Sequence, residues 1–335
     1  MKKVISLILS VILVAALFTG CGASETTETT VAQAVPSSDD TYTVAIIQQL
    51  DHSSLDEIRT AIKAQLEALA AENGITIEIE EYNGQNDTSV LTQISTQVVS
   101  DDVDMIVPIA TLAAQYAVLA AEGTDIPIVY AAISDPESAG LTGLSNVTGV
   151  SDALNTSFIL DMLLAAQPDI ECVGLLYSTS EINSLTPIAE AKAYLDEKGI
   201  AYLEKTGTTS GEITEATASL VGRVDAVFTP TDNTVMAAEA SVAEILNKAG
   251  IPHYTGADSF VTSGAFTTCG VNYTELGTKV ADMAFDLLLG GGVPEFHVMD
   301  GGIITVNTDT AAACGIDYSV FSTMANTIVE VTTVE

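Results

Sequence analysis

Two short polar segments of the chain could together hold a small charged molecule. Ala110-Thr111 ends an apolar run and opens an Ala-rich segment, where free backbone N–H groups, a hydroxyl and the helix dipole would form a seat for a carboxylate. Asp232-Asn233 follows a second apolar run, where an ionised Asp would pair with an ammonium group and Asn would both donate and accept hydrogen bonds. Helix capping is the alternative role of Thr111 and Asp232. Facing seats of this kind favour a zwitterion such as an amino acid.

Both segments lie in a pattern that occurs twice. VDMIVPIATLAAQ, residues 103–115, and VDAVFTPTDNTVMAA, residues 224–238, each contain an apolar run, a turn with Pro and an Ala-rich run. This order predicts a buried strand, a turn and a helix. Because neighbouring segments also correspond in fixed order, the repeat predicts two similar α/β lobes. The alternative is that the two segments resemble each other only as all α/β units do, without common descent. Two similar lobes are expected in that case too.

Other polar residues stand after predicted strands and are further candidates for ligand contact. They are Gln48, Gln49 and His52 after the first strand, Asp135 and Asp258 at later strand ends, Tyr177, Ser180 and Asn183 in the second lobe, and Thr231 before the Asp232-Asn233 pair. Tyr177 could stack on an aromatic ligand. A role in a solvated loop or at the edge of the core is the alternative for these residues.

Expected elements divide the chain between the two lobes. A strand over 43–49, a helix over 54–71 and an alternating, edge-like strand over 75–82 begin the first lobe. We expect the first lobe to comprise residues 42–150 and 274–305 and the second to comprise 151–273 and 306–335, with residues 146–151 as a short β-like connector and residues 265–273 as a β-rich connector. Parallel sheets joined by several crossings leave a cleft at the carboxyl ends of the strands, where ligands of such folds bind.

The amino terminus predicts export. Residues 1–20 carry Lys2 and Lys3, an apolar run and small residues before Cys21, which is the layout of a secretory signal. Their last part resembles a bacterial lipoprotein signal, in which the Cys is lipidated, so we expect a lipid anchor at Cys21. An ordinary cleaved signal is the alternative. Residues 21–41 are polar and aperiodic and are expected to form a flexible tether.

Charge and motifs exclude several classes of function. Without residues 1–20 the chain has 8 Lys and Arg against 45 Asp and Glu, a net charge of −37, so nucleic acid is excluded as a partner. The chain lacks G-x-S-x-G, H-E-x-x-H, P-loop and G-x-G-x-x-G motifs. Its three histidines have no metal-ligand spacing. We therefore expect no enzyme, metal or cofactor. We expect free thiols at Cys172, Cys269 and Cys314, with a disulfide or a reactive nucleophile as the alternative.

A family resemblance covers nearly all of residues 42–318. The segments that carry it are Ile46-Ile47-Gln48 with His52 beyond, residues 134–141, Asn146 to Val150, Pro230 to Asn233, and Tyr273 to Gly277. In this order they resemble the extracytoplasmic substrate-binding proteins of ABC importers with the type I periplasmic-binding fold, especially those for tryptophan and other aromatic amino acids. The resemblance implies two Rossmann-like lobes and capture of an aromatic amino acid for an ABC permease and its ATPase.

Two alternative functions remain open. The same lobes could present a ligand to a receptor as a sensory module. An importer subunit for a sugar or nucleoside is also compatible with the fold, although 5% aromatic residues and no Trp offer little surface for stacking on a sugar.

Overall fold

Two sheets, each covered by helices, organise residues 41–334, the part of the chain that the computed structural model describes. The predicted signal, the Cys21 anchor and nearly all of the predicted tether lie outside the described residues. No helix among the described residues is both long and apolar enough to cross a membrane. Cys172, Cys269 and Cys314 are free thiols.

The first sheet is parallel throughout, in the order β11-β5-β4-β3-β1-β2. Its strands are β1 (Thr41–Gln48), β2 (Thr76–Asn83), β3 (Met105–Ile109), β4 (Ile128–Ala131), β5 (Val147–Ser151) and β11 (His297–Val298). Its helices are α1 (Ser53–Asn73), α2 (Thr88–Ser100), α3 (Thr111–Ala120) and α10 (Tyr273–Leu288). The alternating strand β2 lies at the sheet edge, as its period predicts.

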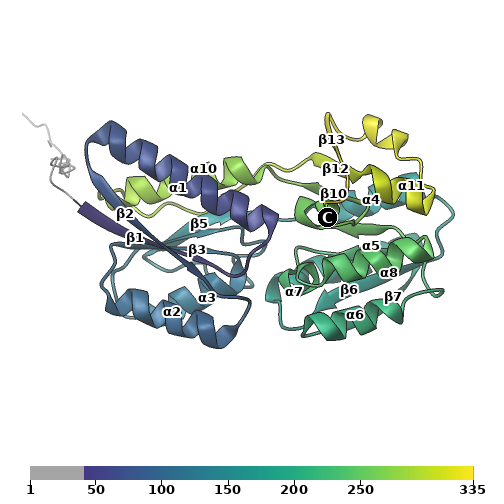
Figure 1. The fold of residues 1–335 in the computed structure, drawn as a ribbon, viewed down its shortest axis with the longest axis horizontal. Coiled ribbons are helices and arrows are strands. Elements are labelled where there is room, and N and C mark those ends of the chain that lie inside the picture. Colours follow the sequence, from purple (N-terminus) through teal and green to yellow (C-terminus); the bar gives the residue numbers. More distant parts are fainter. Residues whose placement is uncertain (1–40, 335) are drawn as a thin grey trace, which may run out of the picture. The chain divides into compact units, whose positions relative to one another are not determined.

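The second sheet has the order β13-β12-β10-β9-β8-β6-β7 and one antiparallel pair, β10 with β12. Its strands are β6 (Cys172–Ser178), β7 (Ala201–Gly207), β8 (Ala226–Thr229), β9 (His253–Thr255), β10 (Thr267–Gly270), β12 (Ile303–Asn307) and β13 (Thr327–Val331). Its helices are α4 (Thr156–Ala166), α5 (Leu185–Lys198), α6 (Ser210–Ala218), α7 (Asn233–Met236), α8 (Glu239–Ala249), α9 (Asp258–Thr262) and α11 (Thr308–Cys314), with 3₁₀ turns η1 (Ile182–Ser184) and η2 (Ser319–Thr323). The predicted class, two α/β lobes with mainly parallel sheets, is confirmed (Figure 1).

Two segments expected as β-like connectors contain strands that belong to the sheets. Residues 146–151 contain β5 and residues 265–273 contain β10, and both pair with neighbours along their length. The expected first lobe ended at residue 305, yet β12 pairs with β10 and β13 in the second sheet. These strands are short, so their membership depends on pairing with distant segments and not on a local pattern. The chain crosses between the sheets after β5, after β10 and between β11 and β12.

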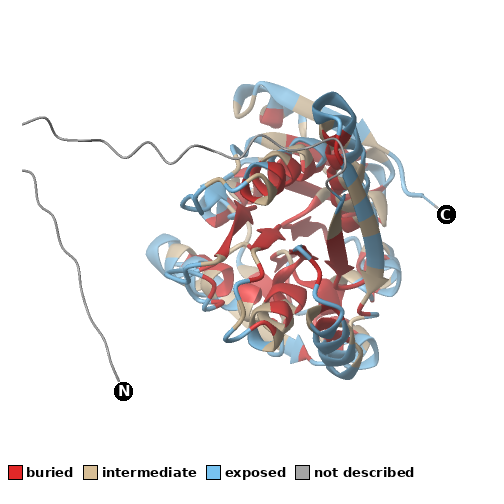
Figure 2. Ribbon diagram, turned by 90° about the vertical axis from the view of Figure 1, so that its left-hand side faces the viewer, coloured by how far each residue is buried: buried red, intermediate tan, exposed pale blue. Residues whose placement is uncertain are grey.

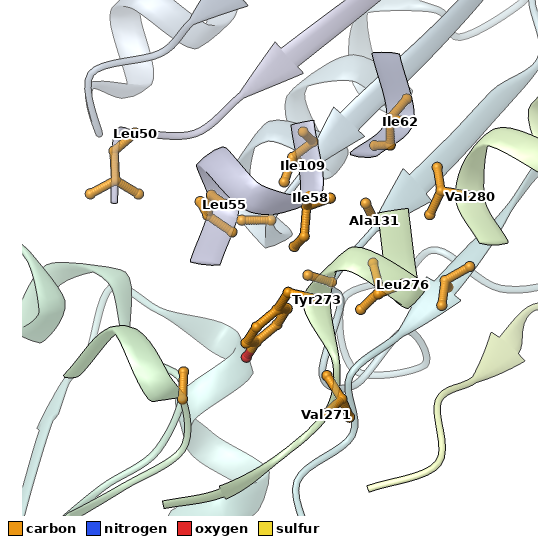
Figure 3. Packing of buried hydrophobic residues seen from close by; sticks show 14 of the residues in the cluster. Leu50, Leu55, Ile58, Ile62, Ile109, Ala131, Val271, Tyr273, Leu276 and Val280 are labelled. Atoms are coloured by element: carbon orange, nitrogen blue, oxygen red, sulfur yellow. The ribbon is translucent and has the colours of Figure 1, made fainter. Parts of the chain in front are cut away.

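Helices α1 and α10 lie side by side on the first sheet (Figure 1). Ile58 and Ile62 of α1 are fully buried against Leu276 and Val280 of α10 (Figure 3). Buried residues lie mainly on the strands and on the inner faces of the helices, whereas the outer helix faces are exposed (Figure 2). The close approach of the two helices requires Gly277, where a Cβ atom would lie 2.6 Å from the carbonyl oxygen of Ile58.

We expect Gly277→Ala to lower the free energy of unfolding by about 1–3 kcal/mol, because the added methyl group would force α1 and α10 apart. Urea denaturation followed by circular dichroism measures this. The matched control is Gly211→Ala in α6, where an added Cβ would meet no atom within 4 Å and the greater helix propensity of Ala should leave stability equal or higher. Equal effects of the two substitutions would contradict the packing argument.

Candidate functional site

A small cavity of about 30 Å³ lies between the two lobes at the carboxyl ends of their strands. Seven residues that the sequence singled out line it: His52, Ala110, Thr111, Asn183, Thr231, Asp232 and Asn233. The remaining lining residues were not anticipated: Ser54, Leu55, Ala132, Ser134, Asp152, Met236, Ala257, Phe260 and Tyr273. The repeated strand-turn-helix pattern therefore contributes its turn to the same cavity from each lobe.

The start of α3 presents free backbone amides. Ala110 has φ 75° and ψ 164°, a conformation that costs energy for any residue with a side chain. This conformation precedes the first turn of α3. The Leu112 amide donates to Oε1 of Gln49 at 3.1 Å, whereas the amides of Thr111 and Ala113 have no partner among the described residues. Two N–H donors at a helix amino terminus are suited to a carboxylate.

Two buried polar atoms of lining residues lack hydrogen-bond partners. One is Nδ1 of His52 and the other is Oδ1 of Asn183. The amide group of Asn183 donates to the carbonyl oxygen of Thr231 at 2.7 Å, so its free oxygen is fixed in place. Burial lowers the pKa of His52 to about 4, and the imidazole is therefore neutral at pH 7. Buried polar atoms are rarely left unpaired in proteins, which makes both atoms candidates for ligand contact.

Asp152 is the lining carboxylate with the fewest protein partners. It is 7% exposed and accepts a hydrogen bond from the hydroxyl of Ser134 at 2.9 Å. Burial raises its pKa to about 6, and it remains largely ionised at pH 7. Tyr273, at the start of α10, directs its hydroxyl out of the apolar cluster toward the second lobe (Figure 3). No Lys or Arg lines the cavity, so a ligand cation would be the natural counter-charge for Asp152.

Asp232 is occupied by its own lobe. Its carboxylate accepts hydrogen bonds from the Ser178 amide at 2.6 Å, the Ser184 hydroxyl at 2.7 Å and the Val235 amide at 2.9 Å. The last bond caps α7, which is the alternative role that the sequence offered. Three donors leave Asp232 little capacity for an ammonium group, and Asp152, which no motif indicated, is freer to bind one.

The rest of the cavity is apolar. Leu55 of α1, Met236 of α7 and Phe260 of α9 contribute hydrophobic side chains, together with Ala257. Small-molecule sites typically combine such surfaces with a few placed polar groups. The arrangement is suited to an amphipathic molecule that has both a charged and an apolar part.

Six candidate residues lie outside the cavity. Gln48 is buried and bonds to Leu50, Asp51, Asp56 and Arg59, while Gln49 joins Asn86, Leu112 and Glu181. Tyr177 donates to Glu204 and does not line the cavity, and Ser180 pairs with Ser178. Asp135 and Asp258 each accept a hydrogen bond from the opposite lobe. Four of these side chains, those of Gln48, Gln49, Asp135 and Asp258, therefore hold elements together around the site. Their position at a strand end did not show whether they would do this or contact a ligand.

Hydrogen bonds join the lobes around the cavity. Ser54 donates to Asp258 at 2.8 Å, the hydroxyls of Ser134 and Thr231 lie 2.8 Å apart, and Thr186 donates to Asp135 at 2.7 Å. Gln49 donates to Glu181 at 3.2 Å, and His52 Nε2 lies 3.4 Å from Asn233 Oδ1. The lobes are therefore in a closed arrangement. Residues 41–334 contain no group of three His, Cys, Asp or Glu side chains placed to hold a metal.

Two α/β lobes that close on a polar cavity at their strand ends define a binding protein of the type I periplasmic-binding fold. The family model for ABC transporter substrate binding protein matches residues 43–324. The chain belongs to this family. Its members bind a substrate and are not enzymes, which confirms that prediction.

Relatives with described ligands are similar over most of the chain. A tyrosine-binding protein of Clostridioides difficile is 32% identical over 93% of this chain and 92% of its own length. A crystal structure of an ABC domain in complex with L-Trp from Streptococcus pneumoniae has a TM-score of 0.81 at 28% identity, covering 87% of this chain and all of that one. A conserved domain protein of Vibrio cholerae gives the same TM-score and identity, with 86% and 100% coverage.

A ligand-free, open structure supports the closed arrangement. This substrate binding protein with adhesive properties from Clostridium difficile is 32% identical and covers 88% of this chain and all of its own, yet its TM-score is 0.66. The L-Trp complex has lower identity and a higher TM-score. Identity alone would predict the reverse order, so these TM-scores are those expected when the lobes of this chain are closed and those of the ligand-free relative are open.

We expect Asp232→Ala to lower the free energy of unfolding by about 2–4 kcal/mol, because it removes a helix cap and leaves two backbone amides and one buried hydroxyl unpaired. Thermal and urea denaturation of ligand-free protein measure the loss. Asp87→Ala is the matched control, since Asp87 caps α2 in the same way but at the surface. It should cost clearly less. An Asp232 variant as stable as the Asp87 variant would contradict the structural role.

Proposed function

We propose that the protein captures an aromatic amino acid between the lobes, with the cavity of about 30 Å³ widening to admit the ring, and delivers it to an ABC permease. The observation that carries this proposal is the pairing, in one cavity, of a buried carboxylate without a cation and free helix amides with an apolar surface. The family membership and the tyrosine- and L-Trp-binding relatives support the ligand class.

The polar atoms suggest how the backbone of an amino acid would be held. The ammonium group would pair with Asp152 and the free oxygen of Asn183, and the carboxylate would accept hydrogen bonds from the Thr111 and Ala113 amides and the Thr111 hydroxyl. The aromatic side chain would pack on Phe260, Met236 and Leu55, where ring contacts add to area burial. Because these groups come from both lobes, a ligand would stabilise the closed arrangement over the open one.

The proposal for delivery and location is supported by the family and by the amino-terminal sequence. The protein would act outside the cytoplasmic membrane, held by a lipid at Cys21, with residues 21–41 as the tether that lets the lobes reach the permease. The closed lobes would carry the amino acid to the permease, and opening would release it there.

Calorimetric titration of residues 22–335 tests the ligand class, after unfolding and refolding to remove any bound molecule. We expect tight binding of L-tyrosine, L-tryptophan or L-phenylalanine and weak or no binding of sugars and nucleosides. Asp152→Asn should weaken binding roughly 10- to 100-fold, as expected for a lost charged hydrogen bond. The control is Asp169→Asn, which changes the same charge on an exposed residue.

Binding of a sugar or nucleoside alone would overturn the ligand class and leave the family role intact. Unchanged affinity in Asp152→Asn would overturn the proposed ammonium partner.

A further inference from the structure

A carboxyl group is fully buried in the contact between the lobes, behind the ligand cavity. Glu181, between β6 and η1, has no exposed surface. Its oxygens accept hydrogen bonds from the side-chain amide of Gln49 in the first lobe at 3.2 Å, from the side-chain amide of Asn233 at 3.2 Å and from the Thr234 hydroxyl at 3.3 Å. None of these partners is charged, so no positive charge offsets the burial of an ionised Glu181.

The charged group that acts on Glu181 is another carboxyl, Asp232. His52 is linked to Glu181 only through Asn233, and its imidazole is neutral because burial lowers its pKa to about 4. Gln49, Asn233 and Thr234 are not titratable. Two neighbouring buried carboxyls without a cation are not both ionised.

The hydrogen bonds decide which of the two carboxyls carries the proton. Asp232 accepts two backbone amides and a hydroxyl at 2.6 to 2.9 Å, which favour its ionised form. Glu181 has longer bonds to neutral side chains, and the Thr234 hydroxyl can turn to accept a proton from it. Glu181 is therefore the group that is neutral in the closed arrangement.

Gln49 is the partner of Glu181 that belongs to the first lobe. When the lobes separate, this amide leaves and water reaches the carboxyl, so that the burial of Glu181 is relieved and only the charge of Asp232, in the same lobe, still raises its pKa. We propose that closing of the lobes takes up one proton at Glu181 and that ligand capture is thereby coupled to pH. The inference rests on the proposed closing of the cleft around a ligand, but not on the identity of that ligand.

The direction of the coupling follows from the two states. In the closed arrangement burial, followed by the charge of Asp232, raises the pKa of Glu181 from the ordinary 4.5 to about 8. Between the pKa of the open form and that of the closed form, the closed form holds a proton that the open form has lost, so closing is favoured at low pH. Affinity should fall as pH rises, by up to about tenfold per pH unit, and should become independent of Glu181 above pH 8.

Disulfide-locked protein tests the proposal without a ligand. Ser134 and Thr231 face each other across the cleft with hydroxyls 2.8 Å apart, so Ser134→Cys with Thr231→Cys should hold the lobes closed when oxidised. NMR of glutamate labelled at Cδ, with the Glu181 signal assigned by its loss in Glu181→Gln, gives the pKa directly. We expect a higher pKa of Glu181 in the oxidised protein than in the reduced protein. A pKa in the oxidised protein no higher than that in the reduced protein would overturn the proposal.

Calorimetry with L-tyrosine tests the coupling to capture. At pH 7, titrations in phosphate and in Tris, whose ionisation enthalpies differ, should show uptake of close to one proton per ligand bound. Asp152 is largely ionised at this pH and should contribute little. Glu181→Gln should abolish the uptake, and Gln49→Ala, which leaves the carboxyl intact but removes its first-lobe partner, should reduce it. Equal uptake in the wild type and Glu181→Gln would overturn the assignment.

If L-tyrosine does not bind, the proposed ligand class is weakened, and the titration of the locked protein still decides this inference.

Discussion

Closing the lobes buries carboxyl groups that have almost no cations to balance them. Asp152, Glu181 and Asp232 are all buried around one cavity, and no Lys or Arg lines it. Burial of each carboxyl is compensated differently. Asp232 accepts three short hydrogen bonds, Glu181 has a raised pKa and holds a proton, and Asp152 accepts a hydrogen bond from a single hydroxyl. The closed form thus has an excess of buried negative charge. A ligand ammonium group at Asp152 and a proton at Glu181 would balance it.

Each lobe contributes the same strand-turn-helix motif to this cavity. In each, a buried strand ends in a turn that begins a helix, β3 with α3 and β8 with α7. The two motifs differ in their hydrogen bonds. The first leaves backbone amides free after the strained Ala110, whereas in the second the Asp232 side chain accepts a hydrogen bond from a backbone amide of its own helix. One turn is therefore open to a ligand and the other is closed by its own cap, which makes the site asymmetric despite the similarity of the lobes.

Much of the fold could be predicted because it depends on local patterns. The period of β2 and the apolar runs of β3 and β8 are visible in the sequence, and seven predicted residues line the cavity. Asp152 and Tyr273 were missed because they stand at crossings between the sheets, where only pairing across the chain defines the geometry, and Ser134 was missed in the loop after the short strand β4. Glu181 has no motif at all. Its environment comes from Gln49, 132 residues away, so no local pattern could indicate it.

The three crossings between the sheets have a mechanical consequence. Asp152 follows β5 and Tyr273 follows β10, so both stand on connections between the lobes. Segments tied at three neighbouring points can bend about one axis but resist sliding and twisting, and residues on that axis move least. Asp152 would then hold nearly the same position in the open and closed forms. A cation that enters the open cleft would then find this charge already in place, and the hydrogen bonds between the lobes would form afterwards as the walls close.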